Sequence, residues 1–258
     1  MVSLDDIQRA REAISGRLHR TPTFSSAALS ERAGARVHLK AELFQRTGSF
    51  KPRGVLAKLD SLTADERSRG VVTWSAGNAA QAVAFGAAAE GISCRVFMWR
   101  TANLLKVAAT RGYGAEVDLD SENAAEAHER LLAHVEATGA VFVHPFDDPV
   151  LHAGHGSLGL ELLEDVPHAD VVVVPVGGGG LISGVAAAVK AVRPAARVVG
   201  VEPEGAAGLT AALEAGHVVA VTPRSVADGL AAPFTGEHCL AVCREHVDRV
   251  VLVTDTEI

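Results

Sequence analysis

Lys51 is the first residue whose setting suggests chemistry. It lies in the stretch GSFKPRG, residues 48–54, between Phe50 and Pro52. Pro52 is typical of the first turn of a helix, where the positive end of the helix disfavours an ammonium ion. Partial burial beside Phe50 would act in the same direction, so both effects lower the pKa of Lys51. A lysine of this kind is a nucleophile that can form a Schiff base, although most lysines only solubilise a surface.

A run of four glycines suggests a second kind of site. Gly177, Gly178, Gly179 and Gly180 follow the apolar run VVVVPV and precede the helix-like LISGVAAAV. Unobstructed backbone N–H groups and the N-terminus of a helix form an anion cradle that suits a phosphate, whereas a plain turn needs only one or two glycines. No Lys-Ser/Thr pair follows, and Ile182 replaces the third glycine of the dinucleotide motif. The run therefore predicts a single phosphate without a nucleotide.

A third loop, in TWSAGNAAQAVA, places Ser75, Gly77 and Asn78 at a strand-to-helix turn. Exposed N–H groups there can hold a carboxylate, and the Asn78 amide can donate to an oxygen anion. Taken alone, an ordinary N-cap by Ser75 or Asn78 is the more common reading. A Schiff-base lysine, a carboxylate loop and a single-phosphate cradle together, however, describe pyridoxal phosphate that holds an amino acid.

Alternating strand-like and helix-like segments would position these loops. Helices are expected at 51–62, 78–91, 104–113, 122–139, 155–166 and 181–192, and strands at 70–76, 93–99, 115–120, 140–146, 169–176 and 196–203, with a strand or hairpin at 35–44. The runs VVVVPV and RVVGV are apolar throughout, as in strands covered by helices on both faces. We therefore predict an α/β fold with mostly parallel sheets and a ligand at the carboxyl ends of the strands.

Composition narrows the class of function. The 258 residues are 48% hydrophobic, enough for one large or two modest domains. The net charge of -7 disfavours nucleic acid and anionic membranes as partners, because both require clustered positive charge, and favours small-molecule chemistry. The start of the chain lacks a signal-peptide core, no apolar run is long enough to cross a bilayer, and the cysteines are odd in number. These features predict a cytoplasmic protein without a disulfide framework.

Seven segments resemble the threonine/serine dehydratases and serine racemases, which are pyridoxal-phosphate enzymes of the tryptophan synthase β-subunit fold (fold type II). The segments are ELFQRTGSFKPRG, SAGNAAQAVAFGA, KVAATRGYGAEV, HPFDD, PVGGGGLISG, VVGVEPEGA and SVADG. The resemblance covers nearly the whole chain in order. It implies two open, mostly parallel sheets flanked by helices, a large cofactor-binding domain of residues 1–69 and 147–258, a small domain of residues 70–146, and a homo-oligomer, expected to be a dimer.

The resemblance also implies a role for each matching residue. Lys51 would form the Schiff base with pyridoxal 5'-phosphate and move the Cα proton, and Phe50 would lie against the cofactor. Asn78 would bond the ring hydroxyl oxygen. The substrate carboxylate would be held by Ser75, Ala76, Gly77 and Asn78, and the phosphate by Gly177, Gly178, Gly179, Gly180 and the Leu181 backbone.

The implied activity is that of a dehydratase (ammonia-lyase), which converts L-threonine, L-serine or a close β-hydroxy amino acid to a 2-oxo acid and ammonia. Ala76 stands where the racemases carry a serine, and the missing hydroxyl favours elimination over racemisation. Ala79 replaces a usual histidine and Trp99 a usual proline. The alternatives are a serine or amino-acid racemase, a β-replacement enzyme, and a degenerate relative that binds without catalysing.

A divalent cation is not favoured. Glu202 and the carbonyl of Ala206 match two ligands of the family's cation site, but Gly208 replaces the acidic third ligand. The chain also ends some tens of residues before the family usually does, and the remainder normally supplies the serine or threonine that bonds the pyridine nitrogen. That contact is therefore not assigned.

Two further groups could suggest metal ligands. His144, Asp147, Asp148, His152 and His155 crowd into one region, but HPFDDP and AGHGS look like loop and packing features. Cys239 and Cys243 are four residues apart in apolar surroundings, which favours buried thiols over metal ligands.

Overall fold

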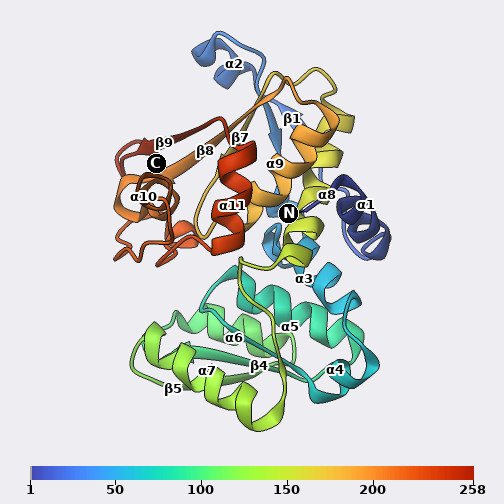
Figure 1. Cartoon of the computed structure of the whole chain (residues 1–258), viewed down its shortest axis with the longest axis vertical. Coiled ribbons are helices and arrows are strands. Elements are labelled where there is room, and N and C mark those ends of the chain that lie inside the picture. Colours follow the sequence, from blue (N-terminus) through green and yellow to red (C-terminus); the bar gives the residue numbers. More distant parts are fainter. Residues whose placement is uncertain (1) are drawn as a thin grey trace.

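The computed structural model describes residues 2–258, which form three β-sheets with helices packed around them. Two parts are stacked along the longest axis of the molecule, each built around one of the larger sheets (Figure 1). Helix α3 (Lys51–Asp60) lies where the two parts meet. Each predicted strand segment contains an observed strand, and the parallel pairing confirms the α/β class.

The first large sheet has four parallel strands in the order β5-β4-β3-β6. Its strands are β3 (Val71–Trp74), β4 (Cys94–Trp99), β5 (Glu116–Ser121) and β6 (Val141–Phe142). Its helices are α4 (Ala64–Arg69), α5 (Asn78–Glu90), α6 (Leu104–Gly112) and α7 (Ala124–Thr138). Every residue of β3 is buried, as its central place requires. The loop that follows β3 is therefore held by a strand with neighbours on both sides.

The second large sheet has three parallel strands in the order β7-β8-β9, namely β7 (Val171–Pro175), β8 (Arg197–Pro203) and β9 (Arg249–Val253). The helices of this part are α1 (Leu4–Ala13), α2 (Ala27–Ala33), α8 (Pro149–Asp165), α9 (Gly180–Val192), α10 (Gly208–Ala215) and α11 (Glu237–His246). Strands β1 (Thr23–Ser25) and β2 (His38–Lys40) form a separate, antiparallel two-stranded sheet. The predicted segment 35–44 thus contains β2, which pairs with a strand that was not predicted. Short 3₁₀ turns occupy η1 (Glu42–Phe44), η2 (Arg46–Gly48), η3 (Glu204–Ala206) and η4 (Asp228–Leu230).

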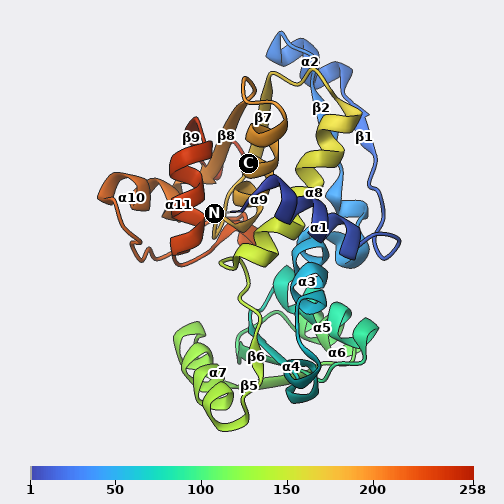
Figure 2. The same ribbon diagram turned by 45° about the vertical axis from the view of Figure 1, so that its right-hand side comes forward.

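Helix α8 begins earlier than predicted. Asp148 caps it by accepting hydrogen bonds from the N–H groups of Val150 and Leu151 (2.8 and 3.3 Å), so AGHGS lies inside the helix and the loop reading of this segment is wrong. The glycines serve close packing: a Cβ on Gly154 would lie 2.4 Å from the carbonyl oxygen of Arg53 in α3. Figure 2 shows α8 running beside α1, α3 and α9, with which it makes the main helix contacts of this part.

The sheet of β7, β8 and β9 departs from a second prediction. In β7, Val172 and Val174 are buried against α8 and α9, whereas Val171 and Val173 are 40% and 62% exposed. The run VVVVPV predicted that helices cover both faces of this strand. Within residues 2–258 that prediction is wrong, because only one face is covered. The exposed valines line a large cavity, so the unbroken apolar run reflects one packed face and one face turned toward that cavity.

A buried charge cluster fixes the start of α3 against α8. The Arg53 guanidinium, 1% exposed, donates to both oxygens of Glu42 (2.8 and 2.9 Å) and of Glu161 (2.7 and 2.9 Å). Lys40 adds an ion pair to Glu161 at 2.9 Å. Displacement of α3 from this placement would leave an uncompensated buried charge, which is strongly destabilising. That placement determines where Lys51 points.

The division into a large domain (1–69 and 147–258) and a small domain (70–146) stays a prediction, and the separation of the two sheets is consistent with it. Among residues 2–258, none of the helices combines the length and apolar character needed to cross a bilayer.

Candidate active site

A cavity of about 1570 Å³ contains every predicted cofactor- and substrate-binding residue in its wall. These residues are Phe50, Lys51, Ser75, Ala76, Gly77, Asn78, Gly177, Gly178, Gly179, Gly180 and Leu181. The loops that carry them follow the carboxyl ends of β3 and β7 or begin α3. The carboxyl edge of a parallel sheet is where ligands bind in α/β folds, so the topology explains why residues so distant in sequence meet.

Lys51 is the first residue of α3, and its Nζ donates to the carbonyl oxygen of Pro145 at 2.7 Å. The same atom lies 5.0 Å from the centre of the Phe50 ring. Burial lowers the pKa of Lys51 from 10.5 to about 8, while the nearby Cys239 acts weakly in the opposite direction. At neutral pH roughly a tenth of such an amine is unprotonated, against well under a thousandth at the usual pKa. Lys51 can therefore act as a nucleophile or base.

The glycine loop is shaped by its neighbours. Gly179 has φ 96° and is the N-cap of α9, a conformation that a residue with a side chain rarely adopts. A Cβ on Gly178 would lie 2.4 Å from the Phe146 ring, and one on Gly180 would lie 2.6 Å from the Phe146 carbonyl oxygen. The first N–H groups of α9 have no acceptor within the helix and border the cavity. This shape suits a phosphate, and the phosphate-binding role of the loop stays a prediction.

The asparagine loop is not an ordinary capped turn. Gly77 occupies the N-cap position of α5, and no side chain caps this helix. The Ser75 hydroxyl accepts from the N–H of Gly77 at 3.1 Å instead. Asn78, the first residue of α5, faces the cavity wall, so the plain N-cap reading of Ser75 or Asn78 is wrong. An uncapped helix N-terminus in a cavity wall suits a carboxylate.

His155 links the start of α3 to the glycine loop from behind the cavity. Its ring packs edge-on against Phe50, with ring centres 4.9 Å apart. Its Nδ1 lies 3.2 Å from the Gly180 carbonyl oxygen. Burial holds the pKa of His155 well below 6.5, so the ring is neutral. His155 thus positions Phe50 and Gly180 relative to each other, which agrees with the packing role expected for AGHGS.

Two further segments of the wall carried no predicted role. Pro145 and Phe146, from HPFDD, support Lys51 and the glycine loop through backbone and ring contacts. The segment 228–233, which begins with the last two residues of SVADG, lines another side of the cavity, where Asp228 forms an ion pair with Lys106 of α6. Both segments overlap motifs that carried the family resemblance, and that overlap was the only signal in the sequence. Their contacts are made by the backbone or by distant partners, which residue types cannot reveal.

Glu202 lies away from the cavity wall and is fully buried. Its carboxylate accepts from the N–H groups of Leu209 (2.7 Å) and Thr210 (2.9 Å) and from the Thr210 hydroxyl (2.7 Å). Burial raises the pKa of this carboxyl. Glu202, which matches a ligand of the family's cation site, thus binds the first turn of α10, and Ala206 is buried in the turn η3 beside it.

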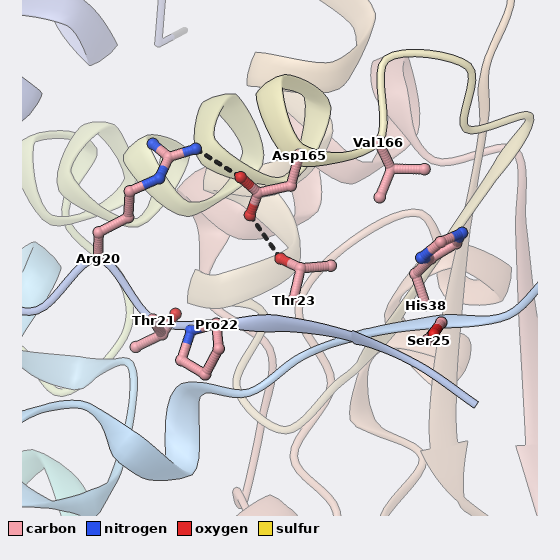
Figure 3. Close-up of a pocket in the computed structure, with 8 residues that line it drawn as sticks. All are labelled: Arg20, Thr21, Pro22, Thr23, Ser25, His38, Asp165 and Val166. Atoms are coloured by element: carbon pink, nitrogen blue, oxygen red, sulfur yellow. Dashed lines mark hydrogen bonds and ion pairs between the residues drawn. The ribbon is translucent and has the colours of Figure 1, made fainter.

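A smaller cavity of about 500 Å³ contains none of the predicted site residues (Figure 3). Its main charged groups are already paired, because Asp165 accepts from Arg20 and Thr23, each at 2.5 Å, and from Lys40 at 3.2 Å. The larger cavity is therefore the candidate active site.

Comparisons with known proteins agree with this geometry. A model of the family described as pyridoxal-phosphate dependent enzyme matches residues 14–258. L-threonine ammonia-lyase of Thermotoga maritima is 45% identical over 259 residues, which cover 100% of this chain and 65% of that protein. The catabolic L-threonine dehydratase TdcB of Escherichia coli K12 is 43% identical over 258 residues, covering 100% of this chain and 78% of that protein.

The fold of maize serine racemase matches with a TM-score of 0.95 and 38% identity, covering 99% of this chain and 78% of that one. The chain therefore spans between 65% and 78% of the lengths of these three proteins.

Proposed function

The chain belongs to the pyridoxal-phosphate dependent enzymes, and from that premise we propose that it is an ammonia-lyase acting on L-threonine, L-serine or a close β-hydroxy amino acid. The products are a 2-oxo acid and ammonia. The observation that carries this proposal is an amine of lowered pKa, Lys51, in one cavity wall with an anion loop and an uncapped helix N-terminus. The names of the two relatives above 40% identity support the reaction class.

The residues of the cavity fit pyridoxal 5'-phosphate. Lys51 and Phe50 would contact its ring end, Asn78 its ring hydroxyl, and the backbone of Gly177, Gly178, Gly179, Gly180 and Leu181 its phosphate. When bound, the cofactor withdraws electrons from the substrate Cα and so stabilises negative charge there. The glycine loop supplies N–H donors without side chains in the way, which is what close approach to a phosphate requires.

Lys51 is the proposed base for the Cα proton. A base works best when its pKa is close to the working pH, and a pKa of about 8 meets this condition. The N–H of Gly77 already donates to the Ser75 hydroxyl, so the remaining donors of the loop and of the first turn of α5 would bind the substrate carboxylate. That contact would hold the Cα–H bond toward the Lys51 amine.

Ala76 favours elimination within this proposal. It lines the cavity with a methyl group and packs partly against the cluster that contains Ala80. A methyl group neither gives nor accepts a proton. Lys51 is then the only proposed proton carrier, so loss of the β-hydroxyl is favoured over return of a proton from the opposite side.

The proposal is tested by replacing Lys51 with Ala. Loss of a nucleophile and base should lower 2-oxo acid formation from L-threonine by at least about 10³-fold and remove the absorption band of the lysine-bound cofactor. The matched control is Lys58→Ala, a half-buried lysine two turns along the same helix that pairs with Asp148. Full activity of Lys51→Ala would overturn the assignment.

Serine racemase is the second candidate, because maize serine racemase is so similar in fold. Assays on L-serine, D-serine, L-threonine and 3-hydroxyaspartate, which follow both the 2-oxo acid and the enantiomer, separate the two activities. The proposal predicts 2-oxo acid as the main product. Enantiomer as the main product would favour a racemase, and cofactor absorbance without turnover of any substrate would favour a binding protein.

The proposal includes assembly into a homo-oligomer, expected to be a dimer, and a cytoplasmic location. Light scattering on the holoenzyme gives the mass in solution, and a mass of one chain, 26.7 kDa, would contradict the first of these points.

A further inference from the structure

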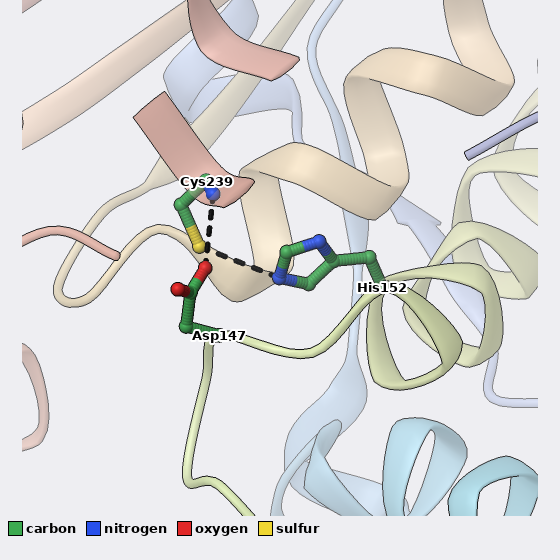
Figure 4. Close-up of side chains that lie close together, drawn as sticks. All are labelled: Asp147, His152 and Cys239. Atoms are coloured by element: carbon green, nitrogen blue, oxygen red, sulfur yellow. Dashed lines mark hydrogen bonds between the residues drawn. The ribbon is translucent and has the colours of Figure 1, made fainter. Parts of the chain in front are cut away.

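A group of side chains with metal-binding chemistry lies behind the glycine loop. Asp147 follows β6, His152 is in α8 and Cys239 is in the first turn of α11, and Figure 4 shows the three side chains turned toward one another. One ligand atom from each lies within 4.8 Å of the others. His152 and Cys239 are fully buried, and none of the three lines the large cavity. The group is thus separate from the proposed substrate site.

Two of the three side chains, His152 and Cys239, contact one backbone oxygen. His152 Nε2 lies 3.3 Å from Cys239 Sγ and 2.7 Å from the Phe146 carbonyl oxygen, and Sγ lies 3.5 Å from that oxygen. Asp147 Oδ1 accepts from the N–H of Cys239 at 3.0 Å, and a carboxylate oxygen of Asp147 lies within 4.8 Å of the other two ligand atoms. Ligands of a tetrahedral zinc ion lie roughly 3.4 to 3.6 Å apart. The contacts of Sγ match this spacing, and the His152 ring must move from the carbonyl by less than about 1 Å.

The protonation states suit a soft or borderline cation. Burial lowers the pKa of His152, so its ring is neutral. Nε2 donates its proton to the Phe146 carbonyl oxygen, and the lone pair lies on Nδ1, which has no partner among residues 2–258. Binding of a metal at Nε2 therefore requires the ring proton to move to Nδ1. Burial, reinforced by Asp147, raises the pKa of the Cys239 thiol, so the thiol keeps its proton until a metal displaces it. The Cys239 sulfur, an Asp147 carboxylate oxygen and the Phe146 carbonyl oxygen thus offer electron pairs in a nearly dry interior, and His152 Nε2 joins them once its proton has moved to Nδ1. A thiolate, an imidazole and a carboxylate are the ligands that zinc prefers.

We propose that Asp147, His152 and Cys239, with the Phe146 carbonyl oxygen, form a binding site for a divalent cation of the zinc class. On binding, the Cys239 S–H bond breaks, the sulfur forms the bond to the metal, and the proton passes to solvent, while the His152 ring proton moves from Nε2 to Nδ1. This site lies elsewhere in the fold than Glu202 and Ala206 and has different ligand types. The Glu202 carboxylate already accepts hydrogen bonds from the first turn of α10.

The position of the site gives it an effect on the glycine loop. A Cβ on Gly179 would lie 2.8 Å from Cys239 Cβ, so the cysteine packs directly against that residue. The N–H of Gly236, just before α11, donates to the Gly178 carbonyl oxygen at 3.4 Å. A bound cation would join α8, α11 and the segment of Phe146 and Asp147 around this loop. Binding should therefore stabilise the folded holoenzyme, because a ligand that prefers the native state raises its melting temperature.

The test measures metal binding rather than turnover. Cofactor-loaded enzyme is stripped with a chelator, incubated with zinc chloride and passed through a desalting column before metal analysis. We expect about one zinc per chain, as a closed protein site requires, and a thiolate-to-metal absorption band when cobalt replaces zinc. Both signals should disappear in Cys239→Ser and fall at least about 10-fold in His152→Gln.

Cys243→Ser is the matched control, because Cys243 is a buried thiol one turn further along α11 and lies outside the group. It should bind zinc as the original chain does. Retention of zinc by Cys239→Ser, or loss in Cys243→Ser alone, would overturn the proposal. If Cys239→Ser does not fold, the cobalt-loaded enzyme without substitutions tests the proposal instead. Absence of a thiolate-to-cobalt absorption band in that enzyme would also overturn the proposal. Because no arm depends on substrate, failure here leaves the proposed lyase activity untouched.

Discussion

At the scale of single residues, the Lys51 amine is controlled mainly by its loss of water. Its hydrogen bond to the Pro145 carbonyl and its place beside the Phe50 ring give it no negative partner that would restore its usual pKa. Burial therefore lowers the pKa to about 8. The sequence predicted this direction from the adjacent Phe50 and from the helix start, but not the contact with Pro145, which lies 94 residues away.

The first prediction concerns the pH dependence of Lys51. Because its pKa is lowered, the reactive unprotonated amine becomes the main form above about pH 8 rather than above pH 10.5. The rate at which the cofactor-free enzyme captures pyridoxal phosphate should rise tenfold per pH unit below that value and level off above it. Stopped-flow absorbance gives the midpoint. A rate that still rises steeply at pH 10 would show that Lys51 keeps its ordinary pKa.

A second prediction concerns Ala76. A hydroxyl in the asparagine loop would give the cavity a second proton carrier, so Ala76→Ser should raise D-serine formation from L-serine relative to 2-oxo acid. We expect the ratio to change by about 10-fold or more. Chiral chromatography of the reaction mixture measures it. Ala80→Ser, in the first turn of α5, is the control, because Ala80 is buried and does not line the cavity; it should leave the ratio nearly unchanged.

At the scale of elements, the glycine loop shows how backbone shape and ligand binding depend on the same residues. Gly179 combines a positive φ with contact to Cys239, so Gly179→Ala meets both strain and a clash. We expect a loss of about 1–3 kcal/mol in stability and weaker cofactor retention.

Gly91→Ala provides the comparison for this third prediction. Gly91 also has positive φ, at the end of α5, but a Cβ there meets nothing within 4 Å. The Gly91→Ala variant should lose about 1 kcal/mol of unfolding free energy through backbone strain alone and should keep its cofactor. Urea denaturation and cofactor absorbance after dialysis give the two quantities. Equal cofactor loss in both variants would contradict a specific role for the loop.

Local patterns predicted most elements, and tertiary contacts explain the rest. The alanine-rich segment 78–91 forms α5 and ends at Gly91, because its spacing and its left-handed glycine are local signals. Helix α8 was predicted to begin at residue 155 because the glycine-rich AGHGS was interpreted as a loop and packing feature. In the structure these glycines allow α1 and α3 to approach closely, which outweighs their low helix propensity. The three site loops were predicted because strand–helix junctions carry recognisable residue types, whereas Phe146 and segment 228–233 contribute through contacts distant in sequence.

At the scale of the whole molecule, Lys106 and Asp228 connect the two sheet-containing parts across the cavity. Lys106 belongs to α6 beside the four-stranded sheet, and Asp228 begins the turn η4 in the other part. The Asp228 side chain is 76% exposed, so the ion pair contributes little to the stability of the fold, about 0–1 kcal/mol. Because both residues line the cavity, we expect the ion pair to affect the entry of substrate instead.

The fourth prediction follows from that position. Lys106→Gln should raise KM for L-threonine several-fold and leave the melting temperature nearly unchanged, because an exposed ion pair holds the rim closed without supporting the core. High salt should raise KM of the unaltered enzyme toward the value of the variant, since salt screens exposed charges. Steady-state kinetics at two salt concentrations measure both effects. Arg100→Gln, which removes an exposed ion pair with Glu122, is the control. An unchanged KM in Lys106→Gln would contradict a role in access.

The contact of α1 and α3 with α8 also has a consequence for synthesis of the chain. Ile7 and Leu56 are buried in one cluster with Ala153 and Leu160 of α8. Because a ribosome makes the chain from its N-terminus, the apolar faces of α1 and α3 emerge well before residues 149–165 exist to cover them. During that interval they are exposed to chaperones and to other nascent chains. The residues of α1 and α3 are therefore among those that reach their final packing late.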